Sequence, residues 1–298
     1  MEPNTVIFGE VLFDHFPDEQ SVLGGAPFNV AWHLRGFGLS PLLVSCVGRD
    51  AGGDQVLSTM DAWGLDTRAV QQHPDYPTGA VQVTLANGQP SFDILADQAY
   101  DHIEVDPILA TLADDPVELI YMGTLVGRSP RSSATLHTLI ERLQASVFVD
   151  VNLRSPWWEL DRVQQVLDNA RWAKLNDIEM NTVLGQELSP QELIPAARSL
   201  LERLKLDLLI LTLGADGAAF ISAKGVEQGA PVPVANLVDT VGAGDAFSSV
   251  TLLGLIRDWP LPVTLQRALQ FASRICGQRG ATAMNRNLYR EMLEDWGT

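Results

Sequence analysis

The residues best suited to chemistry lie in one short stretch near the carboxyl terminus, residues 239–248 (DTVGAGDAFS), which lead into an apolar helical segment at 246–255. Glycines in such a turn leave backbone N–H groups bare at the start of a helix, where the helix dipole also favours an anion. Asp245 lies inside this turn, so its carboxylate could take a proton from a hydroxyl group beside an incoming phosphoryl group. A plain helix N-cap is the alternative role for Asp245, and the local sequence favours neither. The amides available to an anion are those of Gly242, Ala243, Gly244 and Asp245.

Several other kinds of site are excluded by the motifs that the chain lacks. It has neither the GxxxxGK[ST] pattern of a P-loop nor a third glycine that would complete GxGxxG. A dinucleotide-dependent dehydrogenase would carry its glycine fingerprint after the first strand, where this chain has GEVLFD at 9–14. The five histidines lack metal-ligand spacing, and no Ser/His/Asp hydrolase elbow is present.

The elements that must position this turn alternate along the chain between short apolar runs and helical patterns. Apolar runs too short for helices predict strands that are buried on both faces, and segments with apolar residues at helical spacing lie between several of them. This alternation predicts an α/β fold, with a doubly wound, mainly parallel sheet covered by helices on both faces. The predicted strands are 6–12, 42–47, 119–122, 147–151 and 206–213, and the predicted helices are 54–63, 130–144, 158–170 and 190–204.

One region departs from this alternation of strands and helices. Residues 78–94 alternate between apolar and polar residues around Asn87-Gly88, which is a strong hairpin signal. Ligands of parallel sheets bind beyond the carboxyl ends of the strands. A hairpin that projects from that edge would cover the site as a lid and exclude water. An ordinary edge hairpin explains the pattern equally well.

Composition and charge limit the partners and the compartment. The formal net charge of the 298 residues is -17, which disfavours general attraction to nucleic acid or to an anionic membrane surface. Cys46 and Cys276 are the only cysteines, and we interpret both as core thiols in a reducing compartment. The amino terminus carries acids where a secretory signal has basic residues, and no segment reaches the ~20 apolar residues of a membrane span. We therefore expect a cytoplasmic protein.

Two segments together resemble a known family. DTVGAGDAFSSV, which starts at residue 239, resembles the carboxyl-terminal signature of the ribokinase-like, or phosphofructokinase-B type, carbohydrate kinases. Residues 24–38 (GGAPFNVAWHLRGFG) are similar to the amino-terminal signature of that family, and the two signatures come in the same order. The resemblance implies one ribokinase-like kinase domain over 1–298, with a small β lid contributed mainly by about 10–25 and 78–96. It also implies that Asp245 is the catalytic base.

The resemblance further implies a set of sugar-binding residues. Glycines in the first signature let backbone approach a ligand, and Asn29 offers both a donor and an acceptor. Asp14 ends the first predicted strand and is implied as a sugar anchor. Residues 150–154 (DVNLR) are similar to a DxNxR segment of the fructokinase branch. From the residues alone, Asn29 could instead bond local backbone and Asp14 could be a turn residue. The implied substrate-binding residues are Asp14, Gly24, Gly25, Asn29, Asn152 and Arg154.

Two shorter motifs concern ATP and metal ions. Residues 176–179 (NDIE) match the NxxE motif of the family, whose glutamate is associated with placing Mg²⁺, commonly through water. A capping box that involves Asn176 and Glu179 is the alternative. Residues 213–217 (LGADG) resemble a turn near the nucleotide site, although a bare GxxG is more often a hairpin loop. The implied nucleotide-binding residues are Asn176, Glu179, Thr212, Gly214, Gly217, Gly242 and Gly244, and Asp239 and Thr240 are implied for a monovalent cation such as K⁺.

The expected reaction is phosphoryl transfer from Mg-ATP to a hydroxyl group of a small neutral sugar, with fructose favoured. A neutral sugar is expected because the region of Asp14 and Gly24 offers no cationic side chain before Arg35 to bind a substrate phosphate. Kinases of the same fold for 2-keto-3-deoxygluconate, ribose or a nucleoside are alternatives, as is an inactive sugar-binding regulator. The sequence leaves open whether two chains form a homodimer.

Overall fold

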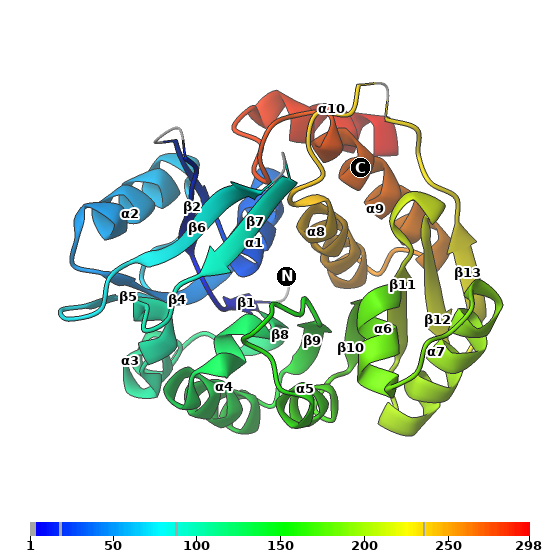
Figure 1. Cartoon of the computed structure of the whole chain (residues 1–298), viewed down its shortest axis with the longest axis horizontal. Coiled ribbons are helices and arrows are strands. Elements are labelled where there is room, and N and C mark those ends of the chain that lie inside the picture. Colours follow the sequence, from blue (N-terminus) through cyan, green and yellow to red (C-terminus); the bar gives the residue numbers. More distant parts are fainter. Residues whose placement is uncertain (1–3, 18–19, 87–88, 235) are drawn as a thin grey trace.

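The computed structural model describes residues 4–17, 20–86, 89–234 and 236–298. Within those ranges, its main feature is a large sheet of nine strands (Figure 1). All neighbouring strands are parallel except the last two along the chain, β12 and β13, which continue the sheet antiparallel. In spatial order the strands are β13 (Gly225–Gly229), β12 (Ala218–Ser222), β11 (Leu208–Thr212), β10 (Trp172–Asn176), β9 (Ser146–Asp150), β8 (Val117–Gly123), β1 (Asn4–Phe8), β4 (Leu42–Gly48) and β5 (Val70–His73).

Helices cover both faces of this sheet, because its strands are apolar on both sides. In β1, Ile7 belongs to one hydrophobic core, whereas its neighbours Val6 and Phe8 belong to the other. The core around Ile7 contains α1 (Ala26–Gly36), α2 (Ala51–Trp63), α8 (Ala243–Ile256), α9 (Leu261–Cys276) and α10 (Arg286–Trp296). The other contains residues of α3 (Val105–Thr111), α4 (Pro130–Leu143), α5 (Leu160–Leu167), α6 (Asp177–Leu184) and α7 (Pro190–Leu204). The predicted fold class is therefore confirmed.

A second, four-stranded sheet forms the lid, with the strand order β3-β2-β6-β7. It consists of β2 (Leu12–His15), β3 (Ser21–Gly24), β6 (Gly79–Ala86) and β7 (Gln89–Ile94). The pair β6 and β7 is antiparallel, as the hairpin pattern predicted, although Asn87-Gly88 itself lies outside the described residues. The expectation of one strand over 6–12 was wrong. Residue 9 is a glycine with φ +152°, where the chain leaves β1 and crosses to the lid, so Asp14 lies in a lid strand.

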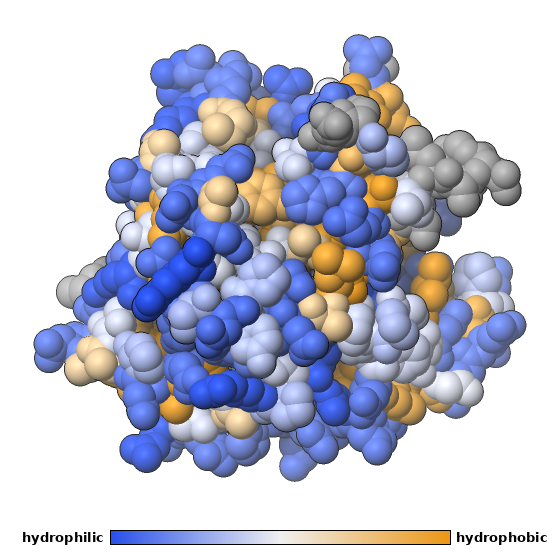
Figure 2. Space-filling model, turned by 60° about the vertical axis from the view of Figure 1, so that its left-hand side comes forward, coloured by the Kyte–Doolittle hydropathy of each residue, from blue (hydrophilic) through white to orange (hydrophobic). Residues whose placement is uncertain are grey.

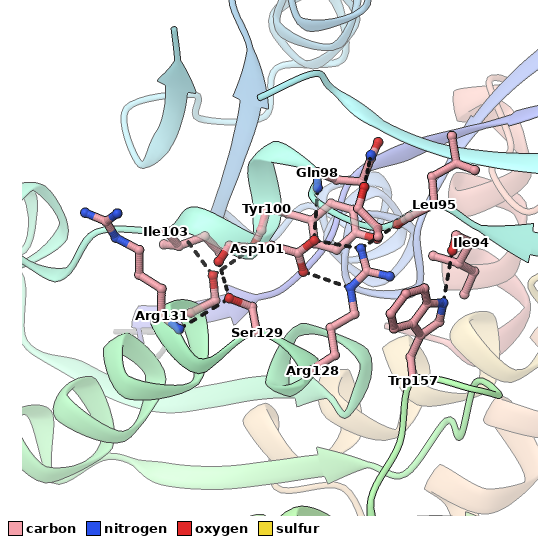
Figure 3. Close-up of polar contacts among 12 residues, drawn as sticks. Ile94, Leu95, Gln98, Tyr100, Asp101, Ile103, Arg128, Ser129, Arg131 and Trp157 are labelled. Atoms are coloured by element: carbon pink, nitrogen blue, oxygen red, sulfur yellow. Dashed lines mark hydrogen bonds and ion pairs between the residues drawn. The ribbon is translucent and has the colours of Figure 1, made fainter. Parts of the chain in front are cut away.

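A buried cluster fastens the end of β7 to the main body (Figure 3). The Arg128 guanidinium forms a buried ion pair with Asp101 (2.7 Å) and donates to the carbonyl of Leu95 (2.7 Å). The indole Nε1 of Trp157 donates to the carbonyl of Ile94 (3.0 Å), and the same guanidinium lies over the Trp157 ring. Arg128 is the last residue of the short helix η2 (Leu125–Arg128), and Asp101 lies in η1 (Ala99–His102). These contacts thus hold the lid to the main body of the protein at the end of β7.

The surface agrees with the acidic composition. On the side shown in Figure 2, hydrophilic residues cover most of the molecule and hydrophobic ones are scattered between them. Within the described ranges, no helix has both the length and the hydropathy to cross a bilayer. Cys46 and Cys276 are both free and buried, as predicted for core thiols.

Candidate active site

A pocket of about 600 Å³ lies between the lid sheet and the edge of the main sheet where β9, β10 and β11 end. Residues that were singled out in the sequence supply much of its wall: Asp14, Gly25, Asn29, Asn152, Arg154, Asn176, Glu179, Thr212, Thr240, Gly242, Gly244 and Asp245. Five other predicted site residues are absent from the part of the wall that the described residues form: Gly24, Gly214, Gly217, Asp239 and Ala243. Its other polar residues are Glu10, Asp150, Ser155 and Lys174.

Asp245 stands in the first turn of α8 rather than at its cap. The N-cap is Gly242, whose φ of +79° favours glycine, and a Cβ atom there would lie 2.3 Å from the Cβ of Ala281. The N–H of Ala243 donates to a carbonyl within the turn (3.3 Å). The N–H groups of Gly244 and Asp245 also lie in the first turn of the helix, where backbone N–H groups have no carbonyl partner within the helix. They are therefore suited to bind an anion.

The carboxylate of Asp245 faces the pocket and is held from the other end of the chain. The Nδ2 of Asn29, on α1, donates to the Oδ2 of Asp245 at 2.7 Å. Burial raises the pKa of Asp245 to about 6; the Asn29 hydrogen bond opposes the rise, Asp150 adds to it, and Lys174 and Arg154 oppose it. At neutral pH the group is therefore mostly ionised and can accept a proton from a weak acid nearby.

The sugar-binding residues predicted from the first signature converge beside this base. A Cβ atom on Gly24 would lie 3.7 Å from the Oδ2 of Asp14 and 3.9 Å from the Oδ1 of Asn29, so both side chains lie next to this glycine. Burial raises the pKa of Asp14 to about 6, and the charge of Arg154 opposes the rise. Gly25 has φ +108°, and a Cβ there would lie 2.7 Å from the Glu10 carbonyl oxygen.

A buried ion pair that the sequence reasoning missed supports the floor of the pocket. The Nζ of Lys174 lies 2.8 Å and 3.0 Å from the two carboxylate oxygens of Asp150. The hydroxyl groups of Ser248 (2.6 Å) and Tyr121 (3.1 Å) donate to the same carboxylate. Burial lowers the pKa of Lys174, but the attraction of Asp150 outweighs it and the net pKa is raised. The ammonium group is 3.6 Å from where a Cβ on Gly244 would be, directly beneath the anion-binding turn.

Asn176 and Glu179 form the capping box that was the alternative interpretation of NDIE. The Oδ1 of Asn176 accepts from the N–H of Glu179 (2.7 Å), and the Oε2 of Glu179 accepts from the N–H of Asn176 (2.8 Å). The Oε1 of Glu179 accepts from the N–H of Leu153 at 3.0 Å. In the described part of the chain, no group of three or more His, Cys, Asp or Glu residues could hold a metal ion. Glu179 nevertheless lines the pocket.

The turn at 213–217 takes the form of the hairpin loop that was its alternative. It connects β11 to the antiparallel β12, and the Leu213 N–H donates to the carbonyl of Gly217 (2.9 Å). Of the residues implied there, Thr212 reaches the pocket from the end of β11. Asp239 links its own loop to the segment after α9, because its carboxylate accepts from the N–H groups of Val241 (3.0 Å) and Gly280 (3.2 Å).

Comparison with known proteins gives a consistent assignment. Residues 5–288 match the family described as pfkB family carbohydrate kinase. An aminoimidazole riboside kinase of Salmonella typhimurium is 30% identical over 261 residues, which are 84% of this chain and 80% of the relative. A fructokinase of Escherichia coli is 26% identical over 266 residues, 86% of this chain and 85% of the relative. The crystal structure of a fructokinase with bound ATP from Xylella fastidiosa has the same fold, with a TM-score of 0.86 over 100% of both chains at 20% identity.

Proposed function

The chain belongs to the pfkB carbohydrate kinase family, and from that premise we propose that it transfers the γ-phosphoryl group of Mg-ATP to a hydroxyl group of a small neutral sugar. The observation that carries this proposal is the placement of Asp245. Its carboxylate faces the pocket at a glycine-bared helix start and is held by Asn29 at 2.7 Å. A base and an anion-binding turn are thus within one turn of one helix.

The proposed roles follow from these positions. Asp14, Gly25 and Asn29 orient the sugar, and Asp245 takes the proton of the attacked hydroxyl group. The amides of Gly244 and Asp245 stabilise negative charge on the transferring group, and the Lys174 ammonium, paired with Asp150, lies beside Gly244. Asn152 and Arg154 line the same pocket from the segment after β9.

Magnesium, when bound with the nucleotide, neutralises charge on the phosphate oxygens. Glu179 is the proposed protein contact, through water, because Mg²⁺ usually keeps several waters and takes few protein ligands. The structure fits this role: the Glu179 carboxylate is fixed by the N–H groups of Asn176 and Leu153 and still lines the pocket. Asn176, Thr212 and Thr240 mark the nucleotide side of the pocket in this proposal.

A neutral acceptor is favoured by the charges around the pocket. Five carboxyl groups, those of Glu10, Asp14, Asp150, Glu179 and Asp245, line it against two cations, Arg154 and Lys174, and Lys174 is already paired with Asp150. Such a wall disfavours a phosphosugar or a sugar acid such as 2-keto-3-deoxygluconate. Fructose is our first candidate because the DxNxR segment is similar to fructokinases. A riboside is the second, because the relative with that activity is 30% identical to this chain.

The direct test is ATP consumption with a panel of acceptors in the presence of Mg²⁺. Fructose, ribose, a nucleoside, 2-keto-3-deoxygluconate and fructose 6-phosphate separate the candidates. We expect turnover with a neutral sugar and kcat/KM at least about tenfold lower for the anionic acceptors. Sugar binding without phosphate transfer would instead indicate a regulator, and preference for an anionic acceptor would contradict the proposed specificity.

A monovalent cation near Asp239 and Thr240 and a homodimer both stay predictions. Both carboxylate oxygens of Asp239 already accept backbone N–H groups, so that carboxylate shapes the loop 239–241 and would contribute charge to a cation site. Activity in K⁺ compared with Na⁺ tests the cation, and the mass of the protein in solution tests the dimer.

A further inference from the structure

Glu10 is a buried acid in the pocket to which none of the proposed roles refers. It lies between β1 and β2, where the chain passes from the main sheet into the lid. Its side chain lines the pocket together with those of Asp14, Asn29 and Asp245, and the residue is only 3% exposed. Its position therefore places a carboxyl group at the junction of lid, base and sugar-binding residues.

One oxygen of this carboxyl group lacks a protein partner. Oε2 of Glu10 is buried and accepts or donates no hydrogen bond among the described residues, and the same holds for Oδ1 of Asn29. A buried polar atom without a partner costs stability, so such atoms are normally met by a ligand or by water. Both atoms belong to residues that line one pocket, and a sugar hydroxyl group could satisfy each of them.

The surroundings of Glu10 determine its protonation state. Burial raises the pKa of Glu10 to about 7; the backbone N–H groups of Glu10 and Ala26 and the charge of Arg154 oppose the rise, and Asp245 adds to it. The charge of Glu10 also affects the pKa values of Tyr100, Tyr121 and Arg128. When Asp245 is ionised, Glu10 therefore tends to keep its proton, and a protonated carboxyl group is a hydrogen-bond donor.

We propose that Glu10 binds the acceptor sugar directly, with its protonated carboxyl group donating a hydrogen bond to a sugar oxygen. This inference rests on the proposed function, because it assumes that the pocket holds a neutral sugar. The two acids then work in opposite states: Asp245 must be ionised to accept a proton, and Glu10 must be protonated to donate a hydrogen bond. Activity should rise through the ionisation of one acid and fall through the ionisation of the other.

The test compares the pH dependence of kcat/KM in wild type, Glu10→Gln and Glu10→Ala between about pH 5.5 and 9. Glutamine keeps a donor and cannot ionise, so we expect kcat/KM near neutral pH to stay within about threefold and the decline on the alkaline side to disappear. Alanine should lower kcat/KM at least about tenfold, because the donor is lost. Glu118→Gln, an exposed glutamate on β8, is the matched control and should leave the profile unchanged.

Sugar binding in the absence of ATP gives a second readout. Because about half of the Glu10 groups carry a proton at pH 7, binding that requires the protonated form should take up as much as about half a proton. Calorimetry in two buffers with different ionisation enthalpies measures this uptake, which should be absent in Glu10→Gln. The glutamine variant keeps the test available if the alanine variant fails to fold.

The outcomes separate this inference from the proposed function. If wild type phosphorylates a neutral sugar and Glu10→Gln retains both the alkaline decline and the proton uptake, the role of Glu10 is overturned while the kinase assignment stands. If wild type phosphorylates no neutral sugar, the proposed function fails and this inference fails with it.

Discussion

Replacing Asn29 with alanine removes the side chain that, among the described residues, donates a hydrogen bond to the proposed base, and its effect can be worked out from the structure. The Asn29 Nδ2 group donates to Asp245 at 2.7 Å and holds down the pKa of that carboxyl, which is about 6. A hydrogen bond to a charged group is worth about 1.5–3 kcal/mol, and about 1.4 kcal/mol corresponds to one pKa unit. The pKa of Asp245 should therefore rise to about 7 or 8 in Asn29→Ala.

The direction of the pH effect follows from the required state of the base. Only ionised Asp245 can accept a proton, so kcat/KM should rise with pH through the pKa of this group. At pH 7 the ionised fraction should fall from about nine tenths to about one half or less, and it should recover at higher pH. Loss of the sugar contact by Asn29 should lower kcat/KM by a further factor that does not depend on pH.

The assay is kcat/KM over the same pH range, with the proposed sugar as substrate. The acid side is best measured with Glu10→Gln as the parent, where no alkaline decline should overlap it. Asn29→Asp is the companion variant: it is similar in size but places a second negative charge beside Asp245, which should raise the pKa further. An acid limb that stays at its wild-type position in a folded Asn29→Ala protein would refute the coupling between these two residues.

Two further predictions concern the floor of the pocket and the anion-binding turn. Lys174→Met leaves the Asp150 carboxylate buried without its cation, so it should lower the free energy of unfolding by about 3–5 kcal/mol, measured by urea unfolding. Adding Asp150→Asn should recover part of this loss of stability. A loss below about 1 kcal/mol in the single variant would contradict the importance of the ion pair. Gly242→Ala places a Cβ atom 2.3 Å from Ala281 at φ +79°, so it should destabilise the protein by at least about 1 kcal/mol and lower kcat, whereas unchanged stability and turnover would speak against a glycine requirement there.

The proximity of Asn29 and Asp245 could be predicted from sequence only through the resemblance to a family. Each residue lies in a glycine-containing segment that leads into a helix, and α1 and α8 pack together in the fold. Local pattern predicted the helical segment that follows Asp245, but nothing in either segment alone indicates that the two side chains meet. The structure adds their hydrogen bond across 216 residues of chain.

The residues that the sequence reasoning missed depend on register between strands. Lys174 pairs directly with Asp150 across β10 and β9, so its role is visible only when the strands are aligned. A lysine inside the apolar strand WAKLN was the available signal, because a buried lysine usually has a partner. Glu10 gave a weaker signal, since the run 6–12 was interpreted as one strand and its break at Gly9 was not anticipated.

Element types were predicted better than their ends. The helix expected at 54–63 begins at Ala51, where Asp50 caps it by accepting from the N–H of Gly53, and the one expected at 158–170 is the shorter Leu160–Leu167. The antiparallel strands β12 and β13 were not predicted as strands, and β13, at the sheet edge, has little apolar pattern. The end of a helix depends on the single side chain that caps it, and an edge strand depends on the strand beside it. The spacing of hydrophobic residues along the sequence predicts neither of them.

Turnover of Asp245→Asn with Mg-ATP and the best neutral sugar tests the role of the base most directly. The amide keeps the size of the side chain and can still bond Asn29, but it cannot accept the hydroxyl proton. We expect kcat to fall about 100-fold or more while the melting temperature stays within about 5 °C of wild type. Near-normal kcat in the folded variant would contradict the assignment of Asp245 as the catalytic base.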